Sequence, residues 1–308
     1  MGTDGVRLED TGLPDINGIT ELSKLLELNR DTVAAMAFGT TKFYRSFQIP
    51  KRSGGSRLIS APYPSLLEVQ RWISTTILAR IPIHEAAHGY VKGRSIISNA
   101  SPHCAKQCLL KMDLRDFFPT ITLNRVIGLF SSFGYSQSVS LFLARLVTLN
   151  GELPQGSAAS PAISNVICWQ LDSRLQGLAT LRSLNYTRYA DDLCFSGEYI
   201  NSGIVDIISE IISNEGFAVN SEKTRLVRGH GRRVVTGISV VNAQPKLPRS
   251  LKRMWRAEIH SCIENGVQKH CEKFGLIEFG YRSSLLGRLS HWAAVEPNNA
   301  YPKKCCQS

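Results

Sequence analysis

The spacing of apolar residues along the chain predicts alternating helices and short strands. Helical spacing extends over about 19–28, 31–38, 65–80, 123–149 (broken around Gly134), 158–179 and 202–214. Short apolar runs predict strands near 108–113, 185–190, 193–197, 217–219 and 233–241. Two more apolar strands flank a Ser-Gly-Gly turn and predict a hairpin over 47–63. Because hairpins and helices interleave, the pattern favours an α+β fold over a doubly wound sheet.

A pair of aspartates interrupts this pattern inside a tight hairpin. The stretch RYADDLCFSG, residues 188–197, has a strand end on each side and puts Asp191 and Asp192 at the apex. Two adjacent carboxylates repel each other. A divalent cation removes that repulsion, since Mg²⁺ takes oxygen ligands and usually one or two carboxylates. An ordinary Asp-Asp turn is the alternative explanation for the stretch taken alone.

A second acidic site lies upstream, where a strand-like run ends at Asp113 and is followed by Asp116 and two phenylalanines. A single aspartate after a strand is usually a cap or turn residue. Together with the later carboxylate pair, it suggests a two-metal site, in which ions about 3.5–4 Å apart activate an attacking hydroxyl and stabilise the leaving oxygen. Such a site suits nucleotidyl transfer, whose catalysis rests on positioning and charge neutralisation.

The excess of basic over acidic residues predicts a polyanionic partner. The 308 residues include 36 Lys and Arg against 25 Asp and Glu, a net charge of +11, and residues 241–308 alone hold 11 basic and 5 acidic side chains. The eight cysteines form no CxxC pair, and no His/Cys ladder has zinc spacing. No signal core or membrane-length apolar run is visible. We therefore expect a cytoplasmic globular protein with no membrane partner.

Five stretches resemble the motifs of reverse transcriptases. KMDLRDFFPTI, LPQGSAASPAISN, RYADDLCFSG and GFAVNSEKTRLV follow the order and spacing of that family's palm motifs, and IPKRSGGSRLISAP resembles its fingers motif. The resemblance covers about residues 43–240. It implies a right-hand polymerase fold with N-terminal helices and fingers in 1–107, a ferredoxin-like palm in 108–240 and a helical thumb in 241–308. A fingers-type helical insertion would occupy about 120–160.

The resemblance also implies roles for individual residues. Asp113, Asp191 and Asp192 would be catalytic ligands of two Mg²⁺ ions, with the Leu114 carbonyl as a further ligand. Phe118 matches the steric gate that rejects a ribose 2′-OH, and plain core packing is the alternative explanation. The residues expected to bind the incoming deoxynucleoside triphosphate or the template are Lys51, Arg57, Gln155, Gly156 and Lys223. Without the family resemblance, Lys51 and Arg57 would be interpreted as solvent-exposed charges of the hairpin.

Two short signatures refine the resemblance to bacterial retron reverse transcriptases. NASPH at 99–103 matches an Asn-Ala-x-x-His signature before the first catalytic strand, and VTG at 235–237 matches a second signature after the palm. Alone, the first could be a loop and the second a strand ending in a glycine bulge. The retron resemblance implies a cognate structured non-coding RNA, DNA synthesis from the 2′-OH of an internal guanosine, and a branched RNA–DNA product. It also implies effector proteins in anti-phage defence.

RNA contacts are expected from these signatures and from the basic C-terminal region, because A-form RNA is recognised by shape and by 2′-OH contacts. The stretch PRSLKRMWRAEIHSCIENG predicts a thumb helix that begins at Pro248 and ends at Gly266. Its apolar face would comprise Leu251, Met254, Trp255, Ile259 and Ile263. The expected RNA-binding residues are Asn99, His103, Arg228, Arg232, Arg233, Val235, Thr236, Gly237, Lys252, Arg253 and Arg256.

Several other functions stay open on sequence grounds. They are an RNA-templated RNA polymerase or a cyclase on a similar palm, a group II intron-like or diversity-generating reverse transcriptase, and a non-catalytic RNA-binding scaffold or antitoxin-like subunit. The fingers motif and Pro-Gln-Gly argue against a cyclase, and Phe118 argues against ribonucleotide use. The intact carboxylates argue against a non-catalytic scaffold.

Overall fold

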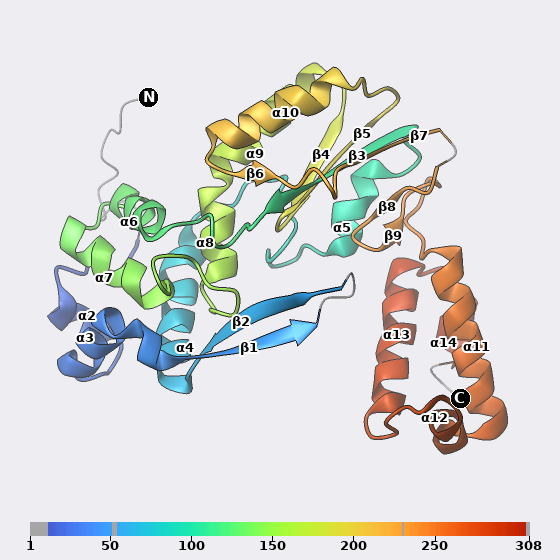
Figure 1. Ribbon diagram of the computed structural model, residues 1–308, viewed down its shortest axis with the longest axis horizontal. Coiled ribbons are helices and arrows are strands. Elements are labelled where there is room, and N and C mark those ends of the chain that lie inside the picture. Colours follow the sequence, from blue (N-terminus) through green and yellow to red (C-terminus); the bar gives the residue numbers. More distant parts are fainter. Residues whose placement is uncertain (1–11, 51–53, 230, 306–308) are drawn as a thin grey trace.

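An antiparallel sheet forms the centre of the molecule (Figure 1), which is described by a computed structural model over residues 12–50, 54–229 and 231–305. The strands lie in the order β4–β5–β3–β6. Strand β7 lies on the same side of β3 as β6. It pairs with the first half of β3, whereas β6 pairs with the end of β3. The bounds are β3 Cys108–Arg115, β4 Asn185–Tyr189, β5 Asp192–Gly197, β6 Ala218–Val219 and β7 Arg225–Arg228. With helices between β3 and β4 and between β5 and β6, this order is that of a ferredoxin-like palm, as the sequence predicts.

The sheet has one face covered by helices, and its other face carries polar side chains together with Leu109 and Cys194, which belong to a second hydrophobic core. The covering helices are α8 Ser160–Ile167, α9 Trp169–Leu181 and α10 Gly203–Asn214. Leu110 and Met112 of β3 join these helices in the main hydrophobic core. Because side chains alternate along a strand, Lys111 and Asp113 lie on the opposite face. The alternation in the sequence thus decides which face is available for chemistry.

The N-terminal part combines short helices with one long hairpin, which projects from them in Figure 1. The hairpin strands are β1 Tyr44–Pro50 and β2 Ser56–Pro62, paired along their whole length. The helices around it are α2 Ile19–Leu25, α3 Arg30–Phe38, α4 Pro64–Trp72, α6 Leu123–Ser132 and α7 Gln137–Val147. Single turns of 3₁₀ or π helix lie at Thr40–Phe43, Ile73–Ile77 and Leu78–Arg80. Helix α5, Ile96–Ala100, and the 3₁₀ turn Ser101–His103 then lead into β3.

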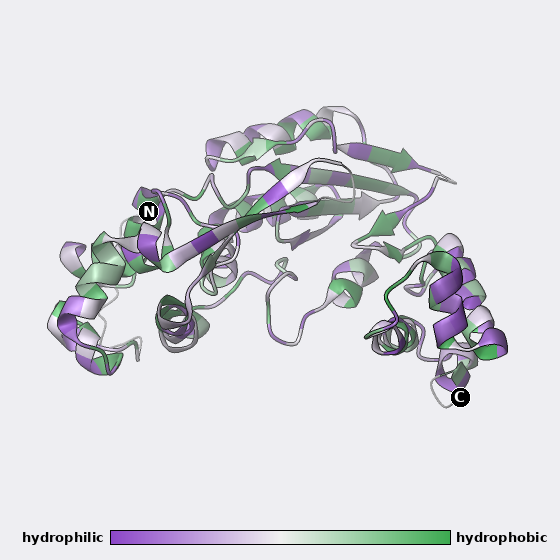
Figure 2. Ribbon diagram, turned by 60° about the horizontal axis from the view of Figure 1, so that its bottom comes forward, coloured by the Kyte–Doolittle hydropathy of each residue, from purple (hydrophilic) through white to green (hydrophobic). Residues whose placement is uncertain are grey.

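The C-terminal part is a small helical unit attached to the palm through a second hydrophobic core. After a short hairpin come four helices, and the bounds are β8 Val234–Val235, β9 Ile238–Ser239, α11 Arg249–Asn265, α12 Val267–Phe274, α13 Tyr281–Val295 and α14 Ala300–Cys305. The second core joins Trp255 and Trp292 of the helices to Leu109 and Cys194 of the sheet. Figure 2 shows long hydrophilic stretches on the helices near the C-terminus. In the described ranges, no helix combines the length and apolar character needed to cross a bilayer.

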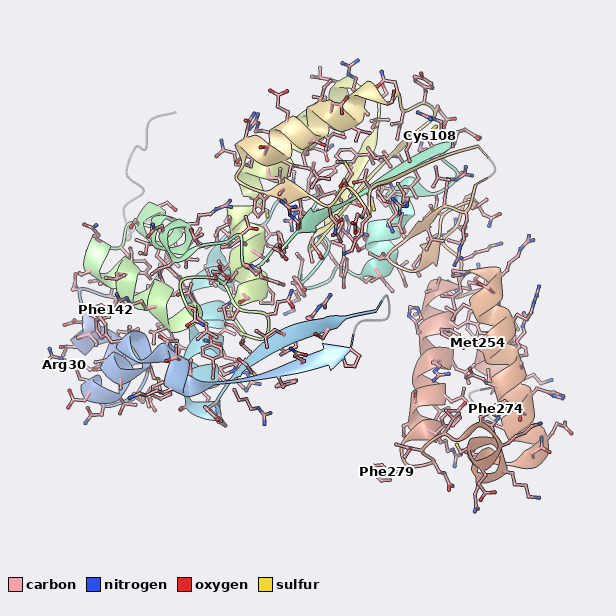
Figure 3. All side chains as sticks on the ribbon, viewed as in Figure 1. Arg30, Cys108, Phe142, Met254, Phe274 and Phe279 are labelled. Carbon is pink, nitrogen blue, oxygen red and sulfur yellow. The ribbon has the colours of Figure 1, made fainter. Side chains whose placement is uncertain are left out.

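The structure corrects the sequence prediction in four places. The stretch 233–241, predicted as one strand, is the hairpin β8–β9, which turns at Thr236 and Gly237 with φ of 43° and 85°. The helix predicted over 158–179 is broken at Cys168, and β7 has no counterpart in the prediction. Met254 and Ile263, expected on the apolar face of the thumb helix, are 48% and 60% exposed, and Figure 3 labels Met254 on this helix. The other helices of this unit cover only the face of α11 that carries Trp255 and Ile259.

Candidate active site

Backbone pairing brings the three predicted carboxylates together. Asp113 on β3 pairs with Asp192, the first residue of β5. Asp192 also pairs with Tyr189, so that Ala190 and Asp191 alone form the turn between β4 and β5. The apex therefore holds Asp191 and not both aspartates, a correction of one residue to the prediction. The amide of Leu114 donates to the Asp191 carbonyl at 2.9 Å and ties this turn to β3.

The carboxylates are crowded enough to need a cation. Burial, together with the charges of Asp192 and Asp113, raises the pKa of Asp191 to about 6. Burial also raises the pKa of Asp192. The ammonium of Lys223 lies 2.9 Å from each carboxylate oxygen of Asp113, and this hydrogen bond raises the pKa of Lys223. A lysine thus already supplies positive charge at the point where the family predicts metal.

The donor set fits Mg²⁺ better than a metal held only by protein. Within the residues described, no three His, Cys, Asp or Glu side chains are grouped so that they could enclose a metal ion. Mg²⁺ usually takes only one or two carboxylates and completes its shell with water and substrate phosphate oxygens. Asp113 and Asp191 both line the same open cleft, and their carboxylates could serve in that way.

This cleft, of about 490 Å³, collects most of the residues that the sequence predicts for nucleotide binding. Arg57 reaches it from β2, Phe118 from the loop after β3, and Gln155 from the Pro-Gln-Gly loop. Lys223 enters from the loop before β7. Lys51 lies outside the described residues. Segments more than 150 residues apart in the chain therefore meet at one site.

Gly156 does not line the cleft; instead its backbone packs against strand β2. Its φ is +126°, and a β-carbon there would lie 2.5 Å from the Ser60 carbonyl oxygen. The amide of Ser60 donates to the Gln155 carbonyl at 2.8 Å. The Pro-Gln-Gly loop can therefore dock on the fingers hairpin only with glycine at this position.

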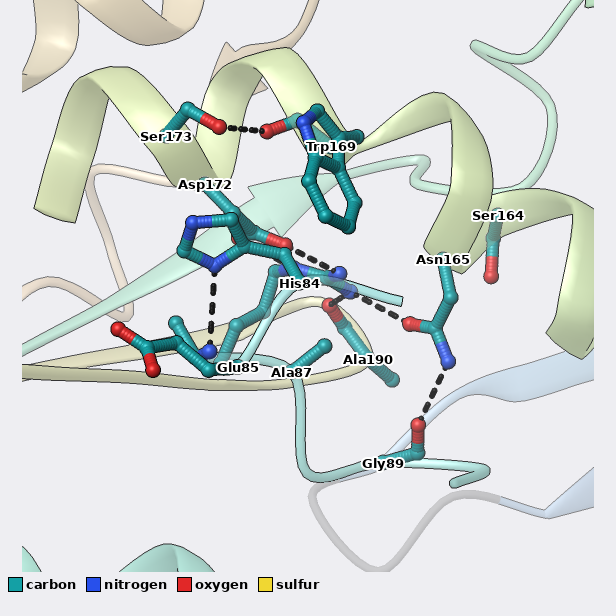
Figure 4. Close-up of polar contacts among 12 residues, drawn as sticks. His84, Glu85, Ala87, Gly89, Ser164, Asn165, Trp169, Asp172, Ser173 and Ala190 are labelled. Carbon is teal, nitrogen blue, oxygen red and sulfur yellow. Dashed lines mark hydrogen bonds and ion pairs between the residues drawn. The ribbon is translucent and has the colours of Figure 1, made fainter. Parts of the chain in front are cut away.

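A buried ion pair supports the Ala190–Asp191 turn from behind (Figure 4). Arg188 and Asp172 are both fully buried and joined at 2.7 Å. Arg188 also donates to Asn165 Oδ1 at 3.0 Å and to the Ala190 carbonyl at 3.3 Å. The amide of Asn165 donates in turn to the Gly89 carbonyl at 2.8 Å. A β-carbon on Gly89 would lie 2.7 Å from the Ala190 nitrogen, so the loop presses directly on the turn.

Two residues at this site escaped the sequence prediction as functional positions. The ring of Tyr90 lies 6.5 Å from the rings of both Phe118 and Tyr189 and lines the cleft. No spacing pattern signals it, because it reaches the site from an irregular loop. Asn220 donates its side-chain amide to Asp113 Oδ1 at 3.2 Å and its backbone amide to the Asp113 carbonyl at 2.8 Å. Its position inside the GFAVNSEKTRLV motif was the available signal.

The residues expected to bind RNA divide into enclosed and exposed groups. Asn99, His103 and Val235 are fully buried, and Arg233 is 5% exposed and donates to the carbonyls of Gln107 and Gly229. Direct RNA contact by these four side chains does not fit their burial. Four others already have partners within the protein. Arg228 donates to the Ile200 carbonyl and Thr236 to the Ile96 carbonyl. Lys252 forms an ion pair with Glu296, and the Arg256 guanidinium lies over the rings of Trp292 and Tyr301. Arg232, Gly237 and Arg253 are exposed.

A second cleft, of about 650 Å³, lies where the β8–β9 hairpin meets the start of α11. Its basic lining residues are Arg232, Lys246, Arg249 and Lys252. Of these, only Lys252 forms an ion pair with another described residue. The cleft therefore offers three exposed cations at the junction of palm and thumb, two of which the sequence prediction did not include.

Comparison with known proteins agrees with this geometry. Residues 49–269 match the reverse transcriptase (RNA-dependent DNA polymerase) family. The chain is 37% identical over 295 residues to the retron Mx162 reverse transcriptase of Myxococcus xanthus, covering 83% of this chain and 61% of that protein. It is 34% identical over 258 residues to the retron Ec86 reverse transcriptase of Escherichia coli, covering 82% and 81%. The chain belongs to the retron reverse transcriptases.

Two further matches describe the extent of the similarity. The retron Mx65 reverse transcriptase of Myxococcus xanthus is 39% identical over 280 residues, which cover 84% of this chain and 63% of that protein. The chain thus spans less than two thirds of the two Myxococcus relatives. Among solved structures, a foamy viral protease-reverse transcriptase in complex with double-stranded DNA aligns with a TM-score of 0.41 and 18% identity. That alignment covers 69% of this chain and 32% of the viral one.

Proposed function

We propose that the protein is an RNA-directed DNA polymerase that copies a structured non-coding RNA from deoxynucleoside triphosphates. The pairing of Asp113 with Asp192, beside the Asp191 turn, carries this proposal. Asp113 and Asp191 border a cleft whose other walls are the fingers hairpin, the Pro-Gln-Gly loop and Phe118, and Asp192 lies behind them without lining it. Membership of the retron reverse transcriptases supports the same reaction.

Each wall of the cleft then has a chemical task. Two Mg²⁺ ions, held by Asp113, Asp191 and Asp192 with the Leu114 carbonyl, would lower the pKa of the attacking hydroxyl and neutralise the departing pyrophosphate. Arg57 can form two hydrogen bonds to the incoming triphosphate, and Lys51 can add a point charge. Gln155 and Tyr90 would position the base pair. Phe118 would exclude a ribose 2′-OH by contact.

The finer steps belong to the same proposal. The cognate RNA would bind along the basic cleft of Arg232, Lys246 and Arg249, since phosphate contacts fix register and orientation. A folded RNA held in one register lets an internal guanosine 2′-OH act as primer, which gives a branched RNA–DNA hybrid. We further propose that this hybrid acts with effector proteins in anti-phage defence.

Primer extension tests the polymerase proposal. The purified protein is incubated with a DNA primer annealed to an RNA template, Mg²⁺ and either dNTPs or rNTPs. We expect extension with dNTPs, little with rNTPs, and none by an Asp113→Asn variant that retains the parental circular-dichroism spectrum and RNA affinity. Absence of extension by the parent protein would refute the polymerase, and equal use of rNTPs would refute the gate.

The priming step has a separate test. DNA synthesised in a host that carries the gene and its flanking RNA region is purified and treated with a debranching enzyme. We expect a shift in mobility that reveals a 2′–5′ branch, and sequencing across the junction should identify one guanosine. A linear product from a protein that passes the extension test would contradict the priming proposal alone.

A further inference from the structure

The Asn-Ala-x-x-His signature lies beneath the catalytic hairpin. His103 is fully buried, with Nδ1 2.7 Å from the Ser196 hydroxyl on β5 and Nε2 2.8 Å from the Thr187 hydroxyl on β4. Thr187 pairs with Cys194, two residues from Ser196, so the imidazole bridges the two strands diagonally. Helix α5 and the 3₁₀ turn that ends at His103 contact these strands directly.

The hydrogen bonds of this group have a fixed direction. Thr187 has one hydroxyl hydrogen, which it donates to the Asn99 carbonyl at 3.4 Å. It must therefore accept from His103 Nε2–H, and Nδ1 must accept from the Ser196 hydroxyl. Burial lowers the pKa of His103 to about 3, which keeps the ring neutral and in this single tautomer. Each donor in the group thus has its own acceptor.

The group continues into the second signature. The Asn99 side-chain amide donates to the Thr236 hydroxyl at 3.3 Å, and Thr236 donates to the Ile96 carbonyl at 3.2 Å. Thr236 and Gly237 form the exposed turn of the β8–β9 hairpin, which borders the basic cleft. The two signatures, 132 residues apart at their nearest ends, are therefore parts of one hydrogen-bonded unit.

The unit bears on catalysis through the register of the sheet. Ser196 and Asp192 lie on the same face of β5, and Thr187 and Tyr189 lie on the same face of β4. The turn that carries Asp191 joins these two strands. A change in the strand spacing at Thr187 and Ser196 is transmitted along a continuous ladder to Asp192 and its partner Asp113. Supporting hydrogen bonds of this kind orient metal ligands.

We propose that His103 is a positioning residue for the catalytic carboxylates: it fastens β4 to β5 and, through Asn99, fastens both to the Thr236–Gly237 turn. This inference rests on the polymerase activity and metal ligands proposed above. It gives the first signature a role in holding the active site, where direct contact with RNA does not fit its burial.

Isosteric variants of the strand hydroxyls test the proposal. Thr187→Val removes the acceptor for His103 and preserves volume, whereas Thr187→Ser keeps the hydroxyl. On a generic annealed primer and template, we expect Thr187→Val to lower kcat about tenfold with the KM for dNTP nearly unchanged, and Thr187→Ser to retain near-parental kcat. Binding of Mn²⁺, followed by electron paramagnetic resonance without substrate, should weaken about tenfold in Thr187→Val only.

Ser196→Ala and Ser140→Ala provide a matched comparison. Both serines are fully buried, but among the described residues the Ser140 hydroxyl bonds only to the Tyr135 carbonyl in the fingers. We expect similar losses of Tm in the two variants and a loss of kcat and Mn²⁺ affinity in Ser196→Ala alone. This pair decides the question if Thr187→Val does not fold. Parental kcat and Mn²⁺ affinity in Ser196→Ala would overturn the positioning role, whereas an inactive parent protein would instead refute the polymerase.

Discussion

At the scale of single residues, the carboxylates that we propose as metal ligands work against the stability of the metal-free fold. Asp191 and Asp192 are mostly removed from water and face Asp113, and the raised pKa of Asp191 measures this cost. The hydrogen bonds of Asp113 to Lys223 and Asn220 and the charge of Lys111 near Asp192 offset part of it. Function and stability therefore make opposite demands at this site.

Replacement of Asp191 by Asn separates the two demands. The pKa of Asp191 is raised from 3.8 to about 6 in the folded protein, so the native state holds an extra proton between these values and stability falls as pH rises through that window. Above pH 6 the full penalty applies. Without Mg²⁺ at pH 7, we expect Asp191→Asn to raise the free energy of unfolding by on the order of 2 kcal/mol in urea titration.

The same variant should lose synthesis by about a thousandfold or more, because a metal ligand supplies several kcal/mol in the transition state. The control is Asp206→Asn at an exposed position on α10. It should not raise the free energy of unfolding, and it should not lower the rate of synthesis. A variant of Asp191 that kept near-parental extension would show that this carboxylate is not a metal ligand.

Phe118 offers a second prediction at the residue scale. Its ring lines the cleft and packs 5.3 Å from Phe117 and 6.5 Å from Tyr90, which leaves it little freedom to move away from a 2′-OH. We expect Phe118→Val to increase the rNTP-to-dNTP ratio of kcat/KM by about 10- to 100-fold. Single-nucleotide incorporation kinetics measure the ratio. An unchanged ratio with a lower Tm would assign Phe118 to core packing.

At the scale of elements, the site depends on loops that dock on regular structure. The Pro-Gln-Gly loop lies on β2, the loop around Gly89 lies on the β4–β5 turn, and the signature helix α5 lies under β4. Each contact is made by backbone or by a fully buried polar side chain. These contacts tolerate little change in volume.

Gly156→Ala tests the docking of the Pro-Gln-Gly loop. The new methyl group would overlap the Ser60 carbonyl, so the loop must move away from the fingers hairpin. We expect a loss of stability of about 1–3 kcal/mol and a higher KM for dNTP. Gly151→Ala is the matched control, because Gly151 also has positive φ (+82°) but open space around its β-carbon position. An equal rise in KM for both variants would attribute the effect to backbone strain alone.

At the scale of the whole molecule, excess positive charge should govern RNA affinity. The chain carries +11, and the palm–thumb cleft concentrates Arg232, Lys246 and Arg249. Counterion release makes such binding weaken linearly in log–log salt plots, with roughly one unit of slope per phosphate contact. The charge thus sets strength, while folded RNA shape must set specificity.

Triple replacement of Arg232, Lys246 and Arg249 by Ala should reduce the salt slope for the cognate RNA by about two to three. It should also reduce synthesis on that RNA far more than extension of a generic annealed primer. A triple replacement of the exposed Lys269, Arg282 and Lys303 makes the same charge change outside the cleft and should have the smaller effect. Equal slopes in the two variants would contradict a specific role for the cleft.

The sequence by itself determined most of the elements, and it named the residues that we propose as catalytic. An apolar run predicted a strand that reaches Asp113, hairpin signals placed Asp191 and Asp192 at a turn, and family motifs named Phe118 and Gln155. These features are local, since a few neighbouring residues decide periodicity and turns. For the same reason, the pattern located α11 between Pro248 and Gly266 correctly.

Only the tertiary structure decided which side chains meet and which are exposed. Burial of Asn99, His103 and Arg233, exposure of Met254 and the approach of Tyr90 all depend on contacts between segments far apart in the chain. A single sequence carries no record of such pairings. The physical reason is clearest at His103, which is buried because partners satisfy its hydrogen bonds, and one of them, Thr187, lies 84 residues away.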